Sequence, residues 1–410
     1  MTKSNFSGMI DRRQLVGMLS VSLVGVSIRP PFALAAADIS IGMVLPFTGA
    51  TGPYGPDMKK SADLVVKTIN DAGGILGGRR LQLYIEDSET SATTSVTATR
   101  KLLDVNKAEM VGGFWGSPEA LASKPLILAA NKVQMVSASA DSITDDSKGL
   151  VYRFQAKSSQ WGPAGAKVVT DLKLKRVSIL AQQNPFVIAM INPFKEAMAT
   201  LGGTIVDVVI YNPNQASYRA EVEKAFGSEP DGVFCASLLT DFVAIAKEVY
   251  RGGYRSKIVA LGTGADADGA FIKSVPNEVS EGIHHLQPGP PLQSDSYKKF
   301  VKEMGAPEGT VFLFAGNTHD QVCVTALAME HAKSQDAAVW SKSIREVCNP
   351  PGDEVDDIVK ALEMVRAGKK VNFVGAGATV DFNERGDQLN RSFVHQVIHN
   401  GKNEIVDIIT

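Results

Sequence analysis

The chain has 410 residues, 42 basic and 44 acidic side chains, and a formal net charge of −2 at pH 7. This near-neutral balance, without a long run of like charge, argues against a nucleic-acid-binding protein and against a disordered tail. Three cysteines are too few for a disulfide scaffold or a cysteine-rich zinc protein. The length and the 44% hydrophobic content predict two domains, each with a core of its own.

Residues 1–37 are predicted to be a signal peptide. Lys3, Arg12 and Arg13 precede 15–28, an uncharged apolar stretch that is too short to cross a membrane. Small residues with an A-x-A cleavage pattern follow it. The paired arginines match a twin-arginine export signal only in part, so ordinary Sec export is at least as well supported, and a retained membrane anchor is the remaining alternative. We therefore expect an exported, periplasmic protein.

The rest of the chain alternates predicted strands and helices. Strands are indicated by β-branched runs and alternation, and helices by apolar residues three to four positions apart. The first series is strand 39–45, helix 57–70, strand 80–86, helix 94–103, strand 110–114, helix 119–131 and strand 134–138. The second is strand 176–181, helix 187–201, strand 204–210, helix 220–226, strand 232–236, helix 242–251 and strand 257–261. This order predicts an α/β protein with two doubly wound, mainly parallel sheets.

Ligands of such sheets bind beyond the carboxyl ends of the strands. Six loops are expected to lie there, namely 46–56, 114–118, 137–144, 182–186, 237–241 and 262–268.

Motifs of enzymes and metal sites do not appear in the sequence. The six histidines form neither an H-x-x-H nor an H-E-x-x-H pair, and G-x-S-x-G and P-loop sequences are missing. The segment 266–269 superficially resembles a calcium loop, but Asn277 stands where the loop requires glutamate. The sequence therefore predicts a protein that is not an enzyme and has neither a metal nor a cofactor.

Three segments carry a resemblance to a known family. They are 69–81 (INDAGGILGGRRL) with the following EDS at 86–88, the loop residues PFTG at 46–49 with Tyr54-Gly55, and the turn VDFNERGD at 380–387. Together they resemble type I periplasmic substrate-binding proteins, in particular the Leu/Ile/Val-type receptors of branched-chain amino acid ABC transporters. The resemblance extends over 38–410 in the same order.

The resemblance implies a periplasmic binding protein type I fold with two lobes joined by three crossover strands. Lobe 1 would comprise 38–154 plus 286–370, and lobe 2 would comprise 155–285 plus 371–410. The crossovers are expected near 151–156, 282–287 and 371–376.

The resemblance also implies a function. The protein would capture a small carboxylate-bearing ligand between closing lobes and deliver it to the permease subunits of an ABC importer. The resemblance implies a monomer, and such a receptor would contact the membrane only through the permease. The alternative is a ligand-sensing module of the same fold, which would bind an amide or amino acid and regulate a partner protein.

The resemblance assigns ligand-binding roles to individual residues. Ser117, Ser139, Ala140 and Ser142 match positions that bind the ligand's carboxylate and amino group. Hydroxyls and backbone N–H groups at helix N-termini hold a carboxylate well, although serine is also an ordinary N-cap residue.

Four further positions are expected to form the less polar walls of the pocket. Tyr54 matches a tyrosine of the family's pocket. Phe186 and Leu238 stand where tyrosine is common, and Trp115 follows a strand end. Trp161 is expected either in the core or at the rim of the cleft.

One expected acid is missing. Amino-acid binders of the family usually carry a glutamate or aspartate after the strand that is here 257–261, where it pairs with the ligand's ammonium group. In this sequence Thr263 supplies no charge, and Asp266 comes two or three residues late. Either Asp266 or Asp141 replaces the acid, or the ligand has no amino group, because an unpaired buried ammonium is costly. Because Phe186 and Leu238 are apolar where the family often has tyrosine, the prediction slightly favours aromatic or aliphatic acids as the ligand.

The cysteines allow one further prediction. Helices predicted over 318–333 and 337–347 form a helical hairpin that brings Cys323 level with Cys348. A disulfide between them is plausible in an oxidising compartment, and two free thiols are the alternative. Cys235 is expected as a small apolar residue of a buried strand.

Overall fold

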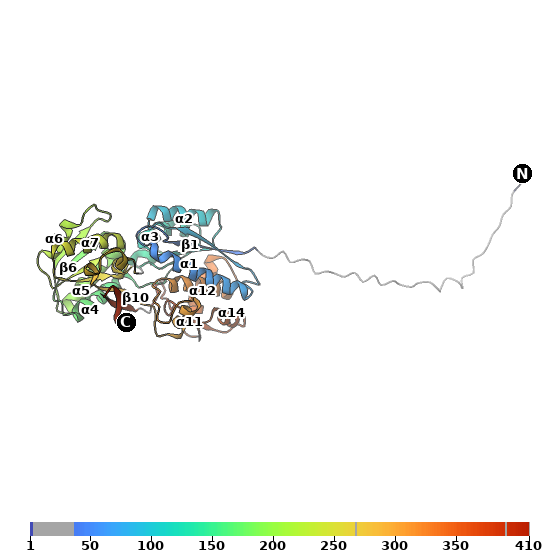
Figure 1. Ribbon diagram of the computed structural model, residues 1–410. Coiled ribbons are helices and arrows are strands. Elements are labelled where there is room, and N and C mark those ends of the chain that lie inside the picture. The colour runs from blue at the N-terminus through green and yellow to red at the C-terminus, as the bar shows by residue number, and fades with distance from the viewer. Residues whose placement is uncertain (3–36, 267–268, 390–391, 410) are drawn as a thin grey trace. The chain divides into compact units, whose positions relative to one another are not determined.

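Two separate β-sheets organise residues 38–410 in the computed structural model of the protein (Figure 1). The structure describes residues 1–2, 37–266, 269–389 and 392–409. The predicted signal peptide lies almost wholly outside these ranges. Parallel strands alternate with helices in both sheets, which confirms the predicted α/β class.

The first sheet has the strand order β2-β1-β3-β4-β5, and all its neighbouring strands are parallel. Alternation along β1 places Ile41 and Met43 in one core with α1 and α12, and Val44 in a second core with α2 and α3. The strands are β1 (Ile39–Leu45), β2 (Leu81–Asp87), β3 (Met110–Phe114), β4 (Val133–Val136) and β5 (Val151–Arg153). The helices are α1 (Gly55–Asp71), α2 (Ala92–Asp104), α3 (Ser117–Ala129), α11 (Asp295–Glu303), α12 (Ala315–Ala332), α13 (Ala337–Cys348) and α14 (Ile358–Arg366).

The second sheet has the order β14-β13-β10-β9-β8-β6-β7. Its two faces are covered by α4 with α5 and by α6 with α7, so that it too lies between two helical layers. The strands are β6 (Arg176–Gln182), β7 (Thr204–Tyr211), β8 (Gly232–Ala236), β9 (Lys257–Leu261), β10 (His284–Pro288), β13 (Phe393–His399) and β14 (Lys402–Ile409). The helices are α4 (Ser158–Asp171), α5 (Pro185–Thr200), α6 (Arg219–Phe226), α7 (Leu239–Gly252), α8 (Gly262–Ala265), α9 (Ala270–Ser274) and α10 (Asn277–Ser280).

The edge of the second sheet contains an antiparallel hairpin that the sequence analysis did not predict. Strand β13 runs antiparallel to both β10 and β14. Asn400 and Gly401 connect β13 to β14, and both have positive φ values, 50° and 70°. Such a turn follows the right-handed twist of paired strands, which explains why these two residues close the hairpin.

Short elements complete the chain. The strands β11 (Asp353–Val355) and β12 (Val371–Phe373) form a separate parallel pair, and single 3₁₀ turns lie at η1 (Gly52–Tyr54) and η2 (Asp141–Thr144). Within the described ranges, none of the helices combines the length and apolar character that a membrane crossing requires.

Two segments lie elsewhere than the expected lobe boundaries place them. The strand β10 belongs to the second sheet over its whole length, although lobe 1 was expected to resume at residue 286. The segment after residue 370 was assigned to lobe 2. In the structure, however, Phe373 and Phe382 belong to the first core, and Phe382 packs edge-on against Tyr152 and Phe154. Burial of these rings, together with a hydrogen bond from the Gln388 backbone N–H to the carbonyl oxygen of Arg153 on β5, keeps the segment with the first sheet as far as Gln388.

Of the two alternatives left open for Cys323 and Cys348, the structure has the free thiols and not the disulfide. Both cysteines lie in the core between α12 and α13, but their thiols are free, as is that of Cys235. Burial raises the pKa of both Cys323 and Cys348 well above the usual value, and their mutual proximity contributes to the rise at Cys323. The helical hairpin therefore brings the two residues near one another without bonding them.

We expect the cysteines to be unreactive in the folded protein. Burial raises the pKa of Cys235 to about 12, so the reactive thiolate is scarce at neutral pH. Ellman titration should find no reactive thiol in the native protein and three after denaturation without a reductant. A single reactive thiol after denaturation would contradict the free thiols and would indicate a disulfide between Cys323 and Cys348.

Candidate ligand-binding site

A cavity of about 550 Å³ lies between loops of the two sheets. All six loops predicted at the strand ends contribute to it. In a parallel sheet the carboxyl ends of the strands lie at the same edge. These edges of the two sheets face each other across the cavity. Its volume lies within the range that small-molecule sites usually have.

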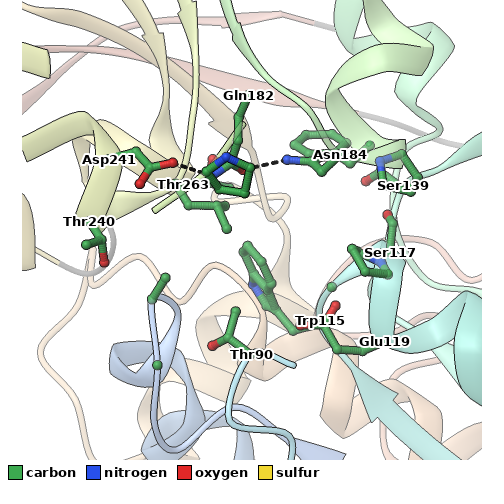
Figure 2. Close-up of a pocket in the computed structure, with 18 of the residues that line it drawn as sticks. Thr90, Trp115, Ser117, Glu119, Ser139, Gln182, Asn184, Thr240, Asp241 and Thr263 are labelled. Carbon is green, nitrogen blue, oxygen red and sulfur yellow. Dashed lines mark hydrogen bonds between the residues drawn. The ribbon is translucent and has the colours of Figure 1, made fainter. Parts of the chain in front are cut away.

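The start of α3 forms one polar wall of the cavity (Figure 2). Gly116 is the N-cap residue, so the following backbone N–H groups of the first turn lack helical acceptors. The Ser117 hydroxyl accepts a hydrogen bond of 3.0 Å from the backbone N–H of Ala140. This bond ties the loop after β4, which carries Ser139, to the helix start. The predicted residues Ser117 and Ser139 both line the cavity, and both are buried.

Aromatic side chains form the apolar walls. Trp115 stacks on Tyr54, with ring centroids 5.5 Å apart, and Phe314 packs edge-on against both rings. On the second lobe's side, Trp161 packs edge-on against Phe186 at 5.2 Å. Trp161 thus lies at the cavity wall as well as in the core. Among the described residues, neither indole N–H finds an acceptor.

A hydrogen-bonded polar group forms the wall opposite α3. The Gln182 side chain donates a hydrogen bond of 2.6 Å to Asp241 and accepts one of 2.6 Å from Asn184 (Figure 2). Asn184 also caps α5 by accepting from the backbone N–H of Val187. Asp241 is in addition bonded to the backbone N–H of Asn214. This carboxylate therefore already has partners within the protein.

Glu119 is the functional candidate that the sequence analysis missed. It occupies the third position of α3 and lines the cavity, with only 4% of its surface exposed. Its side chain folds back over Gly116, where any side chain would collide with the carboxylate. Among the described residues, Glu119 Oε2 has no hydrogen-bond partner. Burial raises the pKa of this carboxyl group, and its own backbone N–H offsets the rise only in part.

The charged side chains among the described residues that line the cavity are all acidic. Glu89, Glu119 and Asp241 line it, whereas none of the described lining residues is lysine, arginine or histidine. Glu89 is exposed at the rim, and the other two acids are buried. The cavity is therefore an acidic environment with aromatic walls.

Several predicted site residues lie outside the cavity lining, while Leu238 and Thr263 line it as expected. Tyr54 lies behind Trp115. Asp266 is bonded to Gly269 and Asn403 instead of facing the cavity. The remaining three are Ala140, whose backbone bonds to Ser117, Asp141, which accepts from the backbone N–H of Ser159, and Ser142, which is exposed. Neither acid proposed as a substitute for the missing glutamate therefore faces the cavity in this structure.

A buried ion pair supports the loop that carries Ser139. Arg153 on β5 is fully buried and donates to Asp387 at 3.0 Å. The same guanidinium donates to the carbonyl oxygens of Ser139 and Ala140, at 2.6 and 2.9 Å. The Thr144 hydroxyl also donates to Asp387 at 2.8 Å. The turn around residue 387 therefore positions a wall of the cavity from behind.

Comparison with known proteins identifies the family of this two-sheet architecture. The family model described as periplasmic binding protein matches residues 38–386. The chain belongs to the type I periplasmic binding proteins of the branched-chain amino acid transporter family. The predicted family is thus confirmed, and the matched range contains every residue that lines the cavity.

Relatives of this binding protein agree with that assignment. The Leu/Ile/Val-binding protein BraC3 of Rhizobium johnstonii is 29% identical over 253 residues, which cover 58% of this chain and 68% of BraC3. The leucine-binding protein LivK of Thermotoga maritima has the same fold, with a TM-score of 0.76, 19% identity and coverage of 90% and 98% of the two chains. A solute-binding protein of R. palustris, solved with benzoate, has a TM-score of 0.70, 17% identity and coverage of 90% and 96%. These relatives are solute-binding proteins.

Proposed function

We propose that this binding protein is the periplasmic solute receptor of an ABC importer. It captures a small ligand in the cavity between its two sheets and presents the loaded form to a membrane permease. The observation that supports this most strongly is that loops from both sheets line one cavity of about 550 Å³. Export by the predicted signal peptide of residues 1–37 brings the protein to the periplasm.

The binding mechanism follows from the division of the cavity wall. Trp115, Ser117 and Glu119 come from the first sheet's side, whereas Gln182, Phe186 and Asp241 come from the second. A ligand that contacts both sets stabilises the state in which they lie close together, and its affinity for that state supplies the free energy of closure. The chain segments that connect the two sheets, one of which follows Arg153, act as the hinge of this closure.

Ligand binding and transport are tested in two steps. The mature protein is unfolded, refolded to remove bound ligand and screened by thermal shift with amino acids and with aromatic and aliphatic acids. A ligand at 100 times its Kd should add about 2.7 kcal/mol to the free energy of unfolding. Small-angle scattering should then show a smaller radius of gyration with that ligand.

The loaded receptor should stimulate ATP hydrolysis by its cognate ABC permease and ATPase, reconstituted together in proteoliposomes. Ligand binding without any stimulation would contradict the transport role and favour a sensing module.

A further inference from the structure

Glu119 is a buried acid that lines the ligand cavity. The side chain is 4% exposed, and Glu119 Oε2 finds no hydrogen-bond donor among the described residues. Asp241, the other buried acid of the cavity, is bonded to Gln182 and Asn214. Of these two acids, only Glu119 keeps an oxygen without a partner for a ligand. An unpaired buried carboxylate is costly, so a donor supplied by the ligand would relieve that cost.

The surroundings favour a positively charged donor over a neutral one. Three acids line the cavity, and the described lining residues include no basic side chain. A cation placed there is attracted by all three, while an anion is repelled. Trp115 and Phe314 add aromatic faces, which also attract cations.

We propose that Glu119 binds the positively charged amino group of the ligand, and that carboxylic acids without an amino group are not ligands of this cavity. The inference rests on the proposed function, because it takes the cavity to be the solute site. In this proposal neither Asp266 nor Asp141 replaces the acid that the sequence lacks after 257–261, and the ligand does carry an amino group. The acid is supplied by the first turn of α3 on one lobe, and no acid is needed after β9 on the other.

The remaining polar groups are compatible with a second, oxygen-bearing end of the same ligand. The indole N–H groups of Trp115 and Trp161 lack acceptors among the described residues, and Ser117 and Ser139 add hydroxyls. An oxygen acceptor on the ligand satisfies these donors. Amino acids and amines with an oxygen function are therefore both admitted, whereas an amino-free acid leaves Glu119 unpaired.

Matched compounds that differ in one charged group test the proposal by isothermal titration calorimetry. The first series is phenylalanine, 2-phenylethylamine and 3-phenylpropanoate, and the second is leucine, 3-methylbutylamine and 4-methylpentanoate. We expect at least one amine-bearing member of a series to bind, and its amino-free acid to bind at least tenfold more weakly. Tighter binding of the acids, or binding of no member of either series, would overturn the proposal.

The variant Glu119→Gln keeps the shape of the side chain and removes its charge. Loss of a charge-assisted hydrogen bond should weaken binding of the amine-bearing ligand about 10- to 100-fold. The ligand-free variant should melt at the same temperature as the wild type or higher, because a buried unpaired charge has been removed. Glu278→Gln, on the exposed helix α10, is the matched control and should change neither quantity.

Two outcomes of the variant experiment would contradict the role of Glu119. One is unchanged affinity for the amine-bearing ligand in a folded Glu119→Gln protein. The other is a Glu119→Gln protein that keeps the full wild-type preference for amine-bearing ligands over their amino-free acids. The proposed transport function fails separately, when a ligand that binds through Glu119 does not lead to stimulation of the permease.

Discussion

Replacement of Asp387 with alanine is expected to lower the free energy of unfolding by about 3–5 kcal/mol. Arg153 is fully buried, and the substitution removes the one carboxylate that is hydrogen-bonded to its guanidinium, among the described residues. The cost arises chiefly from this uncompensated charge, because the attraction within a buried pair is largely offset by the loss of hydration. Urea denaturation followed by circular dichroism measures the effect.

Two matched variants separate the buried pair from other causes. Arg385 lies in the same turn and pairs with Asp145 at the surface, where both side chains are more than half exposed. Arg385→Ala should therefore cost less than about 1 kcal/mol. The double variant Arg153→Met with Asp387→Leu removes both charges and should be more stable than Asp387→Ala alone. Equal stability of the double and single variants would contradict the explanation by an unpaired charge.

Acid should weaken the same ion pair. Burial alone raises the pKa of Asp387, but the Arg153 charge, the Thr144 hydroxyl and Lys157 outweigh it and hold the pKa below its usual value of 3.8. A carboxyl group with a lowered pKa stabilises the folded state above its unfolded pKa. This contribution is lost as the pH falls below 3.8 and through the folded-state pKa. The stability difference between the wild type and Asp387→Ala should therefore shrink in that acidic range.

Replacement of Trp115 with alanine is expected to weaken ligand binding by at least about 30-fold, which corresponds to about 2 kcal/mol. Trp115 is the aromatic wall on the first lobe's side, and Tyr54 and Phe314 hold its ring in place. Its removal takes away contact area for the ligand and exposes the cavity to water. Calorimetric titration with the ligand found in the screen measures the change.

Trp115→Phe should recover most of the lost affinity, because phenylalanine retains an aromatic face without the indole N–H. Tyr250→Ala removes an aromatic side chain that is 55% exposed on α7, and it should leave binding unchanged. If Trp115→Ala binds as tightly as the wild type while remaining folded, the ring is a packing residue and not part of the binding site.

The positions of the loops could be predicted without the structure because they depend on local pattern. Alternating strands and helices predicted parallel sheets, and parallel sheets place their carboxyl-end loops at one edge. All six predicted loops line the cavity. Trp115, Ser117, Phe186 and Leu238 lie in these loops, were singled out with the help of the resemblance to the family, and do line the cavity.

The orientation of individual side chains could not be predicted in this way. Asp266 follows β9 closely enough to suit a ligand-binding role, yet its oxygen Oδ1 accepts hydrogen bonds from the side chain of Asn403 and from its own loop at Gly269. The sequence does not single out Glu119, because glutamate in the first turn of a helix is common for helix stability alone. Only the structure shows that this glutamate folds back over Gly116 and lines the cavity.

The sequence by itself determined the family, the α/β class and the set of loops from which a binding site could be built. These follow from periodicity and from short motifs, which depend on residues close together in the chain. The tertiary structure decided which acid faces the cavity, that Cys323 and Cys348 stay free, and that residues around 382 pack with the first sheet. These features depend on contacts between residues far apart in the chain, and burial and hydrogen bonding there select among side chains that the local pattern leaves equivalent.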